Sequence, residues 1–305
     1  MRFATYSYLD TVRAGVVDED CIHPFPRGVT VLDLVRSGLP AALEAGATVL
    51  GGYPIPVDRV RLLPPLEPPT VRDFVTFEAH VEGMVAPGPV PPEWYEAPTF
   101  YFTNPYALVG AHDDVPIPPN SRLFDFELEV AAVMGPDAIF GYTILNDWSA
   151  RDLQRREMKV QLGPAKGKDS ATTLGPWLVT ADEFTVDGDG ILDLDMRVSV
   201  NGVETGHDRL SNMGWPFEEL VAYAARGTQV RAGDVLGSGT CGNGGCLAEL
   251  WGRGGEQKPL RPGDVVEMTV EGIGTIRNTV VAGVDLPPVR PARPRKDRRV
   301  RVLPR

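Results

Sequence analysis

The alternation of apolar and polar residues along the chain predicts many short strands and few helices. Residues 2–8 and 123–134 alternate in this way, whereas residues 139–145 are almost continuously apolar, which predicts a strand buried on both faces. The remaining expected strands are 100–109, 230–238, a hairpin over 190–203 that turns at Asn201-Gly202, and two strands over 265–284 around Gly272-Ile273-Gly274.

Helical patterns are fewer and shorter. Ser149 and Asp152 have the spacing of a capping box, which predicts a helix over 149–159. Residues 54–66 read as an extended segment. The other expected helices are 30–38, 39–45, the second half of 72–83, and 216–225. With Gly 33 and Pro 29 adding many turns, the fold class is α+β and β-rich.

Proline-rich segments divide the chain. The cluster over 64–69 predicts a boundary that leaves 1–68 as a small N-terminal α+β domain and 69–286 as the main domain. Residues 287–305 form a basic Pro/Arg tail that we expect to be disordered. Residues 84–98, which carry Trp94 and Tyr95, form either a mobile lid or a surface loop with its aromatic side chains packed down.

The net charge of −11 is unevenly distributed. The tail has eight basic residues and one acidic residue, so the first 286 residues carry −18. We therefore expect nucleic-acid binding to be unlikely, since an acidic body repels phosphates, and we expect tolerance of a cation among the carboxylates. The sequence lacks a membrane span and an N-terminal signal pattern, which predicts a cytoplasmic protein with no membrane association. Its three cysteines have no Cys-x-x-Cys spacing and indicate reduced thiols.

Carboxylates gather in one part of the main domain. On a regular strand, Asp125, Glu127 and Glu129 would share one face, where three like charges repel unless they are neutralised. Asp147 follows a buried strand, where an unpaired carboxylate is costly. Oxygen donors without Cys or His nearby suit Mg²⁺, Ca²⁺ or Mn²⁺. From the residues alone, a divalent-cation site and a solvated acidic strand face both remain open.

Short strings run in a fixed order through residues 64–284. They are Glu127-Leu128-Glu129-Val130-Ala131, Gly141-Tyr142-Thr143, Asn146-Asp147-Trp148-Ser149-Ala150-Arg151-Asp152-Leu153-Gln154, Gly167-Lys168, Leu174-Gly175-Pro176-Trp177, Gly237-Ser238-Gly239-Thr240 and Arg261-Pro262-Gly263-Asp264. Together they resemble the fumarylacetoacetate hydrolase superfamily, most closely its fumarylacetoacetase branch. The resemblance implies a mixed β-roll catalytic domain behind a small N-terminal domain, a homodimer, and a diketo or 2-oxo acid substrate from aromatic catabolism. It also implies Mg²⁺ or Ca²⁺, with Mn²⁺ possible, held by Glu127, Glu129 and Asp147.

The resemblance also implies a catalytic base. Asp73 stands seven residues before His80, the spacing of a metal-binding Asp and the catalytic His in that branch. The carboxylate partner of the His would be Glu249, in preference to Glu82, which lies two residues after His80 instead of three. A His needs such a carboxylate to fix its tautomer before it can take a proton from water.

Further residues are assigned to substrate handling by the same resemblance. Lys168, Arg151 and Gln154 are donors suited to a developing oxyanion. Gly239 and Thr240 are suited to hold a substrate carboxylate. Two tyrosines of the fumarylacetoacetase pattern are replaced, one at Val75 and one near Met158, which leaves the acyl group of the substrate open.

The expected activity is cleavage of a carbon–carbon bond in a β-diketo acid such as a fumarylacetoacetate- or acylpyruvate-like compound. A divalent cation would hold the substrate as an enolate, and His80 with Glu249 would activate water. Two alternatives remain. The protein is a decarboxylase, isomerase or hydratase that acts on a 2-oxo acid through a metal-bound enolate, or it is a binding protein that uses the basic tail.

Overall fold

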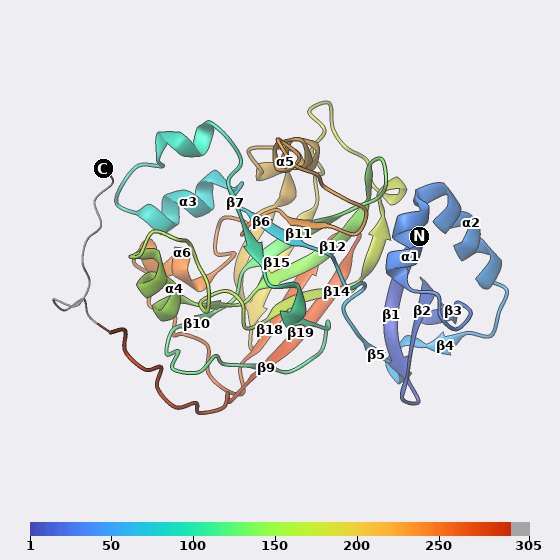
Figure 1. The fold of residues 1–305 in the computed structure, drawn as a ribbon, viewed down its shortest axis with the longest axis horizontal. Coiled ribbons are helices and arrows are strands. Elements are labelled where there is room, and N and C mark those ends of the chain that lie inside the picture. Colours follow the sequence, from blue (N-terminus) through green and yellow to red (C-terminus); the bar gives the residue numbers. More distant parts are fainter. Residues whose placement is uncertain (294–305) are drawn as a thin grey trace, which may run out of the picture.

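The computed structural model describes residues 1–293, and this part of the chain is β-rich with few helices, as the sequence predicts (Figure 1). The α-helices are α1 (Val31–Ser37), α2 (Leu39–Val49), α3 (Glu78–Val85), α4 (Arg151–Met158), α5 (Phe217–Ala224) and α6 (Leu247–Gly252). The strands up to residue 116 are β1 (Arg2–Tyr8), β2 (Thr11–Asp18), β3 (Cys21–Pro24), β4 (Ile55–Pro56), β5 (Arg61–Leu62), β6 (Val71–Phe74), β7 (Phe100–Thr103), β8 (Leu108–Val109) and β9 (Val115–Pro116). The later strands are β10 (Phe124–Asp125), β11 (Leu128–Met134), β12 (Ile139–Asp147), β13 (Ser149–Ala150), β14 (Thr172–Thr180), β15 (Asp195–Val200), β16 (Val203–Arg209), β17 (Val235–Gly237), β18 (Val265–Val270) and β19 (Gly274–Val281).

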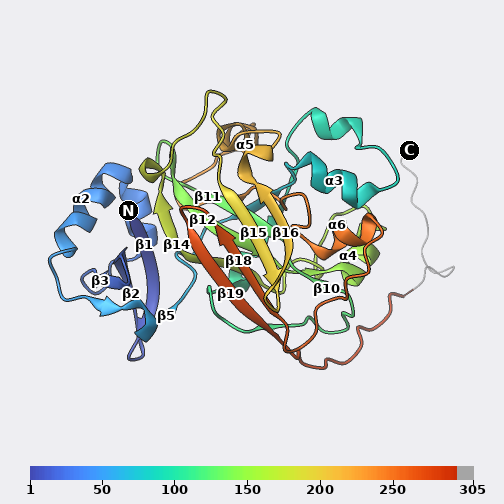
Figure 2. The ribbon, with the colours of Figure 1, turned by 180° about the vertical axis from the view of Figure 1, so that it is seen from behind.

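The strands of the described residues form one large sheet and two smaller ones. The large sheet has the order β4-β3-β2-β1-β14-β12-β11-β17-β6-β7, with β5 beside β1 and β8 beside β14. The second sheet has the order β16-β15-β18-β19-β9, and β10 pairs with β13. The strands β15, β16, β18 and β19 lie against one face of the large sheet (Figure 2).

The central strand β11 is buried on both faces. Leu128, Val130 and Ala132 belong to the core between the two larger sheets, whereas Ala131 and Val133 belong to the core under α1. Each fully buried Leu or Val side chain contributes about 1.5–3 kcal/mol relative to an exposed one. Because successive strand residues point to opposite faces, one continuous apolar run serves two cores.

The N-terminal part shares the large sheet with the rest of the molecule. Phe3 of β1 pairs with Leu178 of β14, and both side chains lie in the core under α1. The domain division near residue 69 stays a prediction. Residues 287–293 contain neither helix nor strand. The rest of the tail, 294–305, lies outside the described residues. The disorder expected there therefore stays a prediction.

Two local predictions near residue 124 and residue 149 are wrong. The strand expected over 123–134 is interrupted between β10 and β11, because side chains take over the backbone hydrogen bonds: Phe126 N donates to Asp125 Oδ1 and Glu127 N donates to Asn146 Oδ1. The expected capping box is absent, since Ser149 lies in β13 and α4 begins at Arg151. The Ser149 hydroxyl donates instead to the carbonyl of Asp147.

The predicted hairpin turn is confirmed. Asn201 and Gly202 have φ values of 54° and 78° and join β15 to β16. The strand β14 was missed because it contains Gly175-Pro176, residues that usually interrupt strands. Among residues 1–293, no helix combines the length and the hydrophobicity needed to cross a bilayer.

Candidate active site

Four carboxylates converge at one end of the central strands of the large sheet, near the carboxyl ends of β6 and β12 and the amino end of β11. Asp73 of β6, Glu127 before β11, Glu129 of β11 and Asp147 of β12 each place a carboxylate oxygen within 4.8 Å of the others. All four are buried, with at most 5% of any of them exposed. Gly237 leaves the space for this cluster, since a Cβ there would lie 2.8 Å from Glu129 Oε2 and 2.9 Å from Asp73 Oδ1. The solvated acidic face considered above is therefore wrong.

Strand pairing explains why these carboxylates meet. Leu128 of β11 pairs with Asn146 of β12, which brings Glu127 beside Asp147, and the Asp147 amide donates to the Glu127 carbonyl at 3.3 Å. The strand β17 lies between β11 and β6, with Gly237 in register with Asp73. The cluster is thus fixed by the backbone hydrogen bonds of the large sheet.

Two cations and a phenol contact the cluster from one side. Lys168 Nζ lies 2.5 Å from Glu127 Oε2 and 2.5 Å from Asp147 Oδ2, and the hydroxyl of Tyr101 donates to the same Asp147 oxygen at 2.5 Å. Arg151 Nη2 lies 2.7 Å from Glu127 Oε1. Burial alone would raise the pKa of Glu127, but Lys168 and Arg151 hold it below its ordinary value. Glu127 is the carboxylate that these cations neutralise.

The other three carboxylates lack enough neighbouring positive charge to offset the burial of their charged forms. Burial raises the pKa of Asp73, and burial followed by repulsion from neighbouring carboxylates raises the pKa of Glu129 well above the usual range. Burial also raises the pKa of Asp147 well above the usual range, because it outweighs the opposing effect of Lys168. Burial would lower the pKa of Lys168, but Asp147 and Glu127 raise it, so the ammonium stays charged. Four acids against two cations leave room for a further positive charge.

Unpartnered oxygens show where a cation fits. Asp73 Oδ1, Glu129 Oε1 and Asp147 Oδ1 are buried and have no hydrogen-bond partner, which is costly for a carboxylate. A hard divalent cation such as Mg²⁺, Ca²⁺ or Mn²⁺ takes oxygen donors of this kind. The residues present therefore fit the divalent cation that the sequence suggests.

Asp125 corrects the expectation from strand parity. It does not belong to the carboxylate cluster of Asp73 and its neighbours; it binds Arg151 Nε at 2.8 Å and accepts from the amides of Leu247 and Ala248 at the start of α6. The break between β10 and β11 turns it toward α6. Asp125 thus positions both Arg151 and the helix that carries Glu249, a role that its local sequence did not indicate.

Arg151 and Gln154 lie on α4 beside the cluster. Arg151 Nη1 donates to Gln154 Oε1 at 3.1 Å, and the guanidinium also contacts Asp125 and Glu127. This arrangement holds the guanidinium in a single orientation. Gln154 is half-buried, with Gly167 packed directly against its backbone.

The predicted base and its partner lie on facing helices. His80 of α3 has its Nδ1 3.6 Å from Glu249 Oε2 of α6, slightly longer than a hydrogen bond. Glu249 is fully buried, and its other carboxylate oxygen accepts from Arg253 Nε at 3.1 Å. Glu82 is exposed. The structure thus places Glu249, and not Glu82, beside His80.

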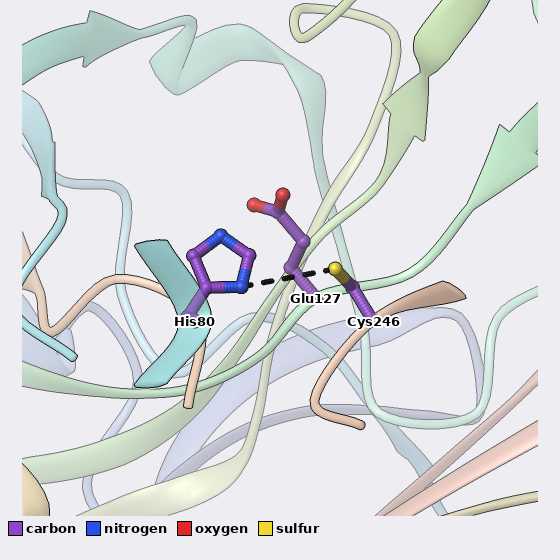
Figure 3. Close-up of side chains that lie close together, drawn as sticks. All are labelled: His80, Glu127 and Cys246. Atoms are coloured by element: carbon purple, nitrogen blue, oxygen red, sulfur yellow. Dashed lines mark hydrogen bonds between the residues drawn. The ribbon is translucent and has the colours of Figure 1, made fainter. Parts of the chain in front are cut away.

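Cys246 completes the surroundings of His80. Its Sγ lies 3.9 Å from His80 Nδ1, and it also accepts from the amide of Glu249 at 3.3 Å as the N-cap of α6. Figure 3 shows His80, Glu127 and Cys246 converging from three separate elements. Cys246 was not predicted as a site residue, although its position immediately before the segment that carries Glu249 was a signal in the sequence.

Gly239 and Thr240 follow β17 at the edge of the site. Gly239 has φ 80°, and a Cβ there would meet the carbonyl oxygen of Phe74 at 2.3 Å, so only glycine fits. Its amide donates to Glu129 Oε2 at 3.1 Å, so the structure directs this donor at a cluster carboxylate. Thr240 is buried, with 4% of its surface exposed.

The loop over 84–98 is packed down through one of its aromatic residues. Trp94 Nε1 donates to the carbonyl of Val75 at 2.7 Å, and its ring packs edge-on against Trp215 at 4.8 Å. Tyr95 stays 54% exposed. These contacts favour the packed surface loop over the lid. Met158, at the end of α4, is 50% exposed.

A small cavity is lined by two of the residues that contact the carboxylate cluster, Tyr101 and Lys168. Its volume is about 190 Å³, and Tyr101, Asn104, Lys168 and Asp169 are among its lining residues. Such a volume suits a small acid, and the ammonium of Lys168 supplies the matching charge. Tyr101 was missed from the sequence, although it lies on the strand that pairs with Asp73. A larger cavity of about 710 Å³ lies between the N-terminal part and Tyr106 and includes none of the cluster residues.

The chain resembles known proteins over most of its length. A family model described as fumarylacetoacetate (FAA) hydrolase C-terminal matches residues 70–281. The 2,4-didehydro-3-deoxy-L-rhamnonate hydrolase of Sphingomonas sp. (strain SKA58) is 31% identical over 302 residues, which cover 92% of this chain and 96% of that protein.

Two solved structures show the same fold. A 5-carboxymethyl-2-hydroxymuconate delta-isomerase from Mycobacterium smegmatis superposes with a TM-score of 0.67 at 26% identity and covers 92% of this chain and 100% of that chain. A maleylpyruvate hydrolase from Sphingobium sp. SYK-6, in complex with manganese(II) and pyruvate, superposes with a TM-score of 0.69 at 23% identity and covers 93% of this chain and 100% of that chain. One fold therefore accommodates hydrolases and isomerases.

Proposed function

The chain belongs to the fumarylacetoacetate hydrolase family, and on that basis we propose that it is a metal-dependent hydrolase that cleaves a carbon–carbon bond in a β-diketo acid. One observation carries the proposal. A His–Glu pair, His80 with Glu249, lies beside a carboxylate cluster whose free oxygens fit a divalent cation. A cation site alone would serve several reactions, but a base able to activate water favours hydrolysis.

The proposed ligands are Glu127, Glu129 and Asp147, with Asp73 as the fourth carboxylate. The donor set is all oxygen, which favours Mg²⁺ or Ca²⁺ and also suits Mn²⁺. When bound, the cation would supply a Lewis acid for the two carbonyl oxygens of a β-diketo acid.

His80 is the proposed base. Its Nδ1 faces Glu249, so Nε2 is the nitrogen that can take a proton from water. The resulting hydroxide adds to one carbonyl carbon of the diketo acid. The bond from that carbon to the carbon between the two carbonyls then breaks, and the departing carbon takes the electron pair and then a proton. The products are one carboxylic acid and one shorter oxo acid.

Lys168 and Arg151 are the proposed stabilisers of the oxyanion that forms at the attacked carbonyl, with Gln154 supporting Arg151. Both cations are held in place before the reaction by Glu127. Donors fixed in advance lower the barrier because they need no reorganisation, and losing one typically costs about 10²–10³ in turnover. Thr240 is proposed to contact the substrate carboxylate, whereas the amide of Gly239, which the sequence assigns to the same role, donates to Glu129 Oε2 instead.

A substrate panel tests the proposal. Acylpyruvates and fumarylacetoacetate-like diketones are incubated with the protein in Mg²⁺, and again after EDTA treatment. We expect consumption of at least one member in Mg²⁺, its loss in EDTA, and its recovery when Mg²⁺ is restored. If no member of the panel were consumed in Mg²⁺ or in Mn²⁺, the hydrolase assignment would be contradicted.

A second candidate is isomerisation, decarboxylation or hydration of a 2-oxo acid at the same site. A His80–Glu249 distance that stayed at 3.6 Å with substrate bound would favour it, since a base that is not firmly paired activates water less well. The similarity in fold and sequence to a delta-isomerase points the same way. Product analysis separates the outcomes: two acids indicate hydrolysis, CO₂ release indicates decarboxylation, a gain of one water in a single product indicates hydration, and unchanged mass indicates isomerisation. The expected homodimer stays a prediction.

A further inference from the structure

A second group of metal-binding side chains lies next to the carboxylate cluster. His80, Cys246 and Glu127 each place one donor atom within 4.8 Å of the others, and all three residues are buried. They come from α3, from the N-cap of α6 and from the segment before β11, and Figure 3 shows them converging. Nitrogen, sulfur and oxygen donors together are typical of zinc and not of magnesium.

The distances around His80 Nδ1 match a tetrahedral zinc site. Bonds of about 2.0–2.3 Å to a tetrahedral centre place neighbouring donor atoms roughly 3.3–3.8 Å apart. His80 Nδ1 lies 3.9 Å from Cys246 Sγ and 3.6 Å from Glu249 Oε2. Both separations are longer than strong hydrogen bonds and close to the spacing of two ligands on one ion.

An unpartnered carboxylate oxygen lies next to the same histidine nitrogen. Glu249 is fully buried, and its Oε2 has no hydrogen-bond partner although it lies beside His80 Nδ1. Such an oxygen is costly to bury, and a cation next to it would remove that cost. The other oxygen of this carboxylate is already bound to Arg253. This observation does not depend on the cysteine.

The charges in this region allow a second cation. Arg151 and Lys168 already bind Glu127, so zinc would share that carboxylate with them, while the Cys246 thiol would release its proton to solvent on binding zinc. The buried acids at the two sites outnumber the neighbouring cations: Asp73, Asp125, Glu127, Glu129, Asp147 and Glu249 against Arg151, Lys168 and Arg253. The donors of the two sites differ in softness. Mg²⁺ would therefore prefer the all-oxygen carboxylate cluster, and Zn²⁺ would prefer the group that contains His80 and Cys246.

We propose that His80, Cys246 and Glu127 form a zinc-binding site that adjoins the carboxylate cluster, shares Glu127 with it, and inhibits the enzyme when it is filled. The inhibitory part rests on the proposed role of His80 as the base, because a nitrogen that binds zinc is held in place and its ring can no longer cycle a proton with water. The binding part stands on the geometry alone. The protein would then be active with Mg²⁺ and silenced by Zn²⁺.

Cobalt(II) in place of zinc tests the binding directly, since a thiolate bound to cobalt gives a sulfur-to-metal charge-transfer absorption in the near ultraviolet. The protein is titrated with Co²⁺ in excess Mg²⁺, which keeps the carboxylate cluster occupied. We expect the absorption in the unaltered protein and in Cys241→Ser, and its loss in Cys246→Ser. Serine is a good N-cap, so Cys246→Ser preserves the start of α6. Cys241 is the matched control, since it is a buried, free cysteine of the same loop.

The affinity for Zn²⁺ is measured by competition with a chromophoric chelator. We expect Cys246→Ser to lose more than the roughly 10–100-fold that removal of a residue outside the coordination sphere costs. Absence of the charge-transfer band in the unaltered protein, or an equal band in Cys246→Ser, would overturn the site.

Inhibition is tested separately, with each variant compared with its own zinc-free rate. We expect Zn²⁺ to stop turnover in Mg²⁺ for the unaltered protein and to inhibit Cys246→Ser only at concentrations at least about 100-fold higher. Equal inhibition of both would overturn the inhibitory part. A cobalt–sulfur band in a protein that hydrolyses no member of the panel would support the zinc site and contradict the proposed function. Hydrolysis of a panel member by a protein that gives no such band would support the proposed function and contradict the zinc site.

Discussion

The two halves of the candidate active site are built differently. The carboxylate cluster lies on paired strands of the large sheet, and Lys168 contacts Glu127 and Asp147 at 2.5 Å. The base lies on two short helices, and His80 stands 3.6 Å from Glu249. The strand-built half is already assembled, whereas the helix-built half is slightly open. We infer that cation binding needs little rearrangement and that the catalytic pair tightens only when substrate is present.

The packing of α3 against α6 sets the geometry of the helix-built half. The helices α3 and α6 approach so closely that a Cβ on Gly252 would lie 1.9 Å from the carbonyl oxygen of Gly83. A Cβ on Gly83 would lie 2.3 Å from Glu249 Cγ. This contact sets the distance between His80 and Glu249, and it is independent of the strand pairing that sets the cluster.

The largest effect on turnover is expected when a carboxylate of the strand-built half is removed. In Asp147→Asn the turnover should fall by roughly 10⁴-fold, because the Lewis acidity of a cation is worth several kcal/mol. Calorimetry should show greatly weakened Mg²⁺ binding, while the metal-free melting temperature should change little, because the loss of a buried charge offsets the loss of its attraction to Lys168. Unchanged Mg²⁺ affinity would show that Asp147 is not a ligand.

The next effect separates chemistry from cation binding. His80→Ala should lower kcat by about 10³-fold, within the range for loss of a general base, and Glu249→Gln should have a smaller effect of about 10²-fold. Both variants should bind Mg²⁺ as the unaltered protein does. Glu82→Gln, an exposed carboxylate on the same helix as His80, is the control and should leave kcat unchanged. If Glu82→Gln lost activity and Glu249→Gln did not, the pairing would be assigned to the wrong residue.

A glycine change should disturb only the helix-built half. Gly252→Ala should push α6 away from α3, cost about 1–3 kcal/mol of unfolding free energy, and reduce kcat by about 10²-fold through misplacement of Glu249. Mg²⁺ affinity should stay the same. Gly51→Ala, where a Cβ meets no atom within 4 Å, is the matched control and should change stability by less than about 0.5 kcal/mol. Parallel losses of Mg²⁺ affinity and kcat in Gly252→Ala would show that the two halves are not independent.

The smallest effect is a dependence of stability on pH. Burial raises the pKa of Asp73, and burial with mutual repulsion raises those of Glu129 and Asp147, so without a cation the folded state holds these protons more tightly than the unfolded chain. Their contribution to stability is fully present below about pH 4 and is lost as the pH rises through the folded-state pKa values. Glu127 has a lowered pKa, so its contribution to stability is present at higher pH and is lost as the pH falls through its folded-state pKa.

Thermal unfolding in EDTA and in Mg²⁺ measures this dependence. The melting temperature in EDTA should decline as the pH rises above about 5, and the increment added by Mg²⁺ should grow, because the cation replaces protons on the same carboxylates. A Mg²⁺ increment that is independent of pH would contradict a cation bound by these groups.

The sequence predicted the strand-built half better than the helix-built half. Strand alternation and burial, which are local properties of the chain, brought Glu127, Glu129 and Asp147 into consideration, and the resemblance to the fumarylacetoacetate hydrolase superfamily assigned them as ligands. Asp125 was grouped with them wrongly, since its partners Arg151 and α6 are distant in sequence and interrupt the strand. Helix α6 and the role of Cys246 at its start were not predicted, because a helix of six residues is too short to show a helical period. Contacts between distant segments, which no local pattern encodes, account for these errors.

The most direct test of the central claim uses water labelled with heavy oxygen. The Mg²⁺-loaded protein is given a substrate from the panel, and the products are identified by mass spectrometry for the unaltered protein and for His80→Ala. The account predicts two acids, one carrying a single solvent oxygen in its new carboxylate, with a rate that collapses in His80→Ala. A single product of unchanged mass, release of CO₂, or equal rates for both proteins would contradict it.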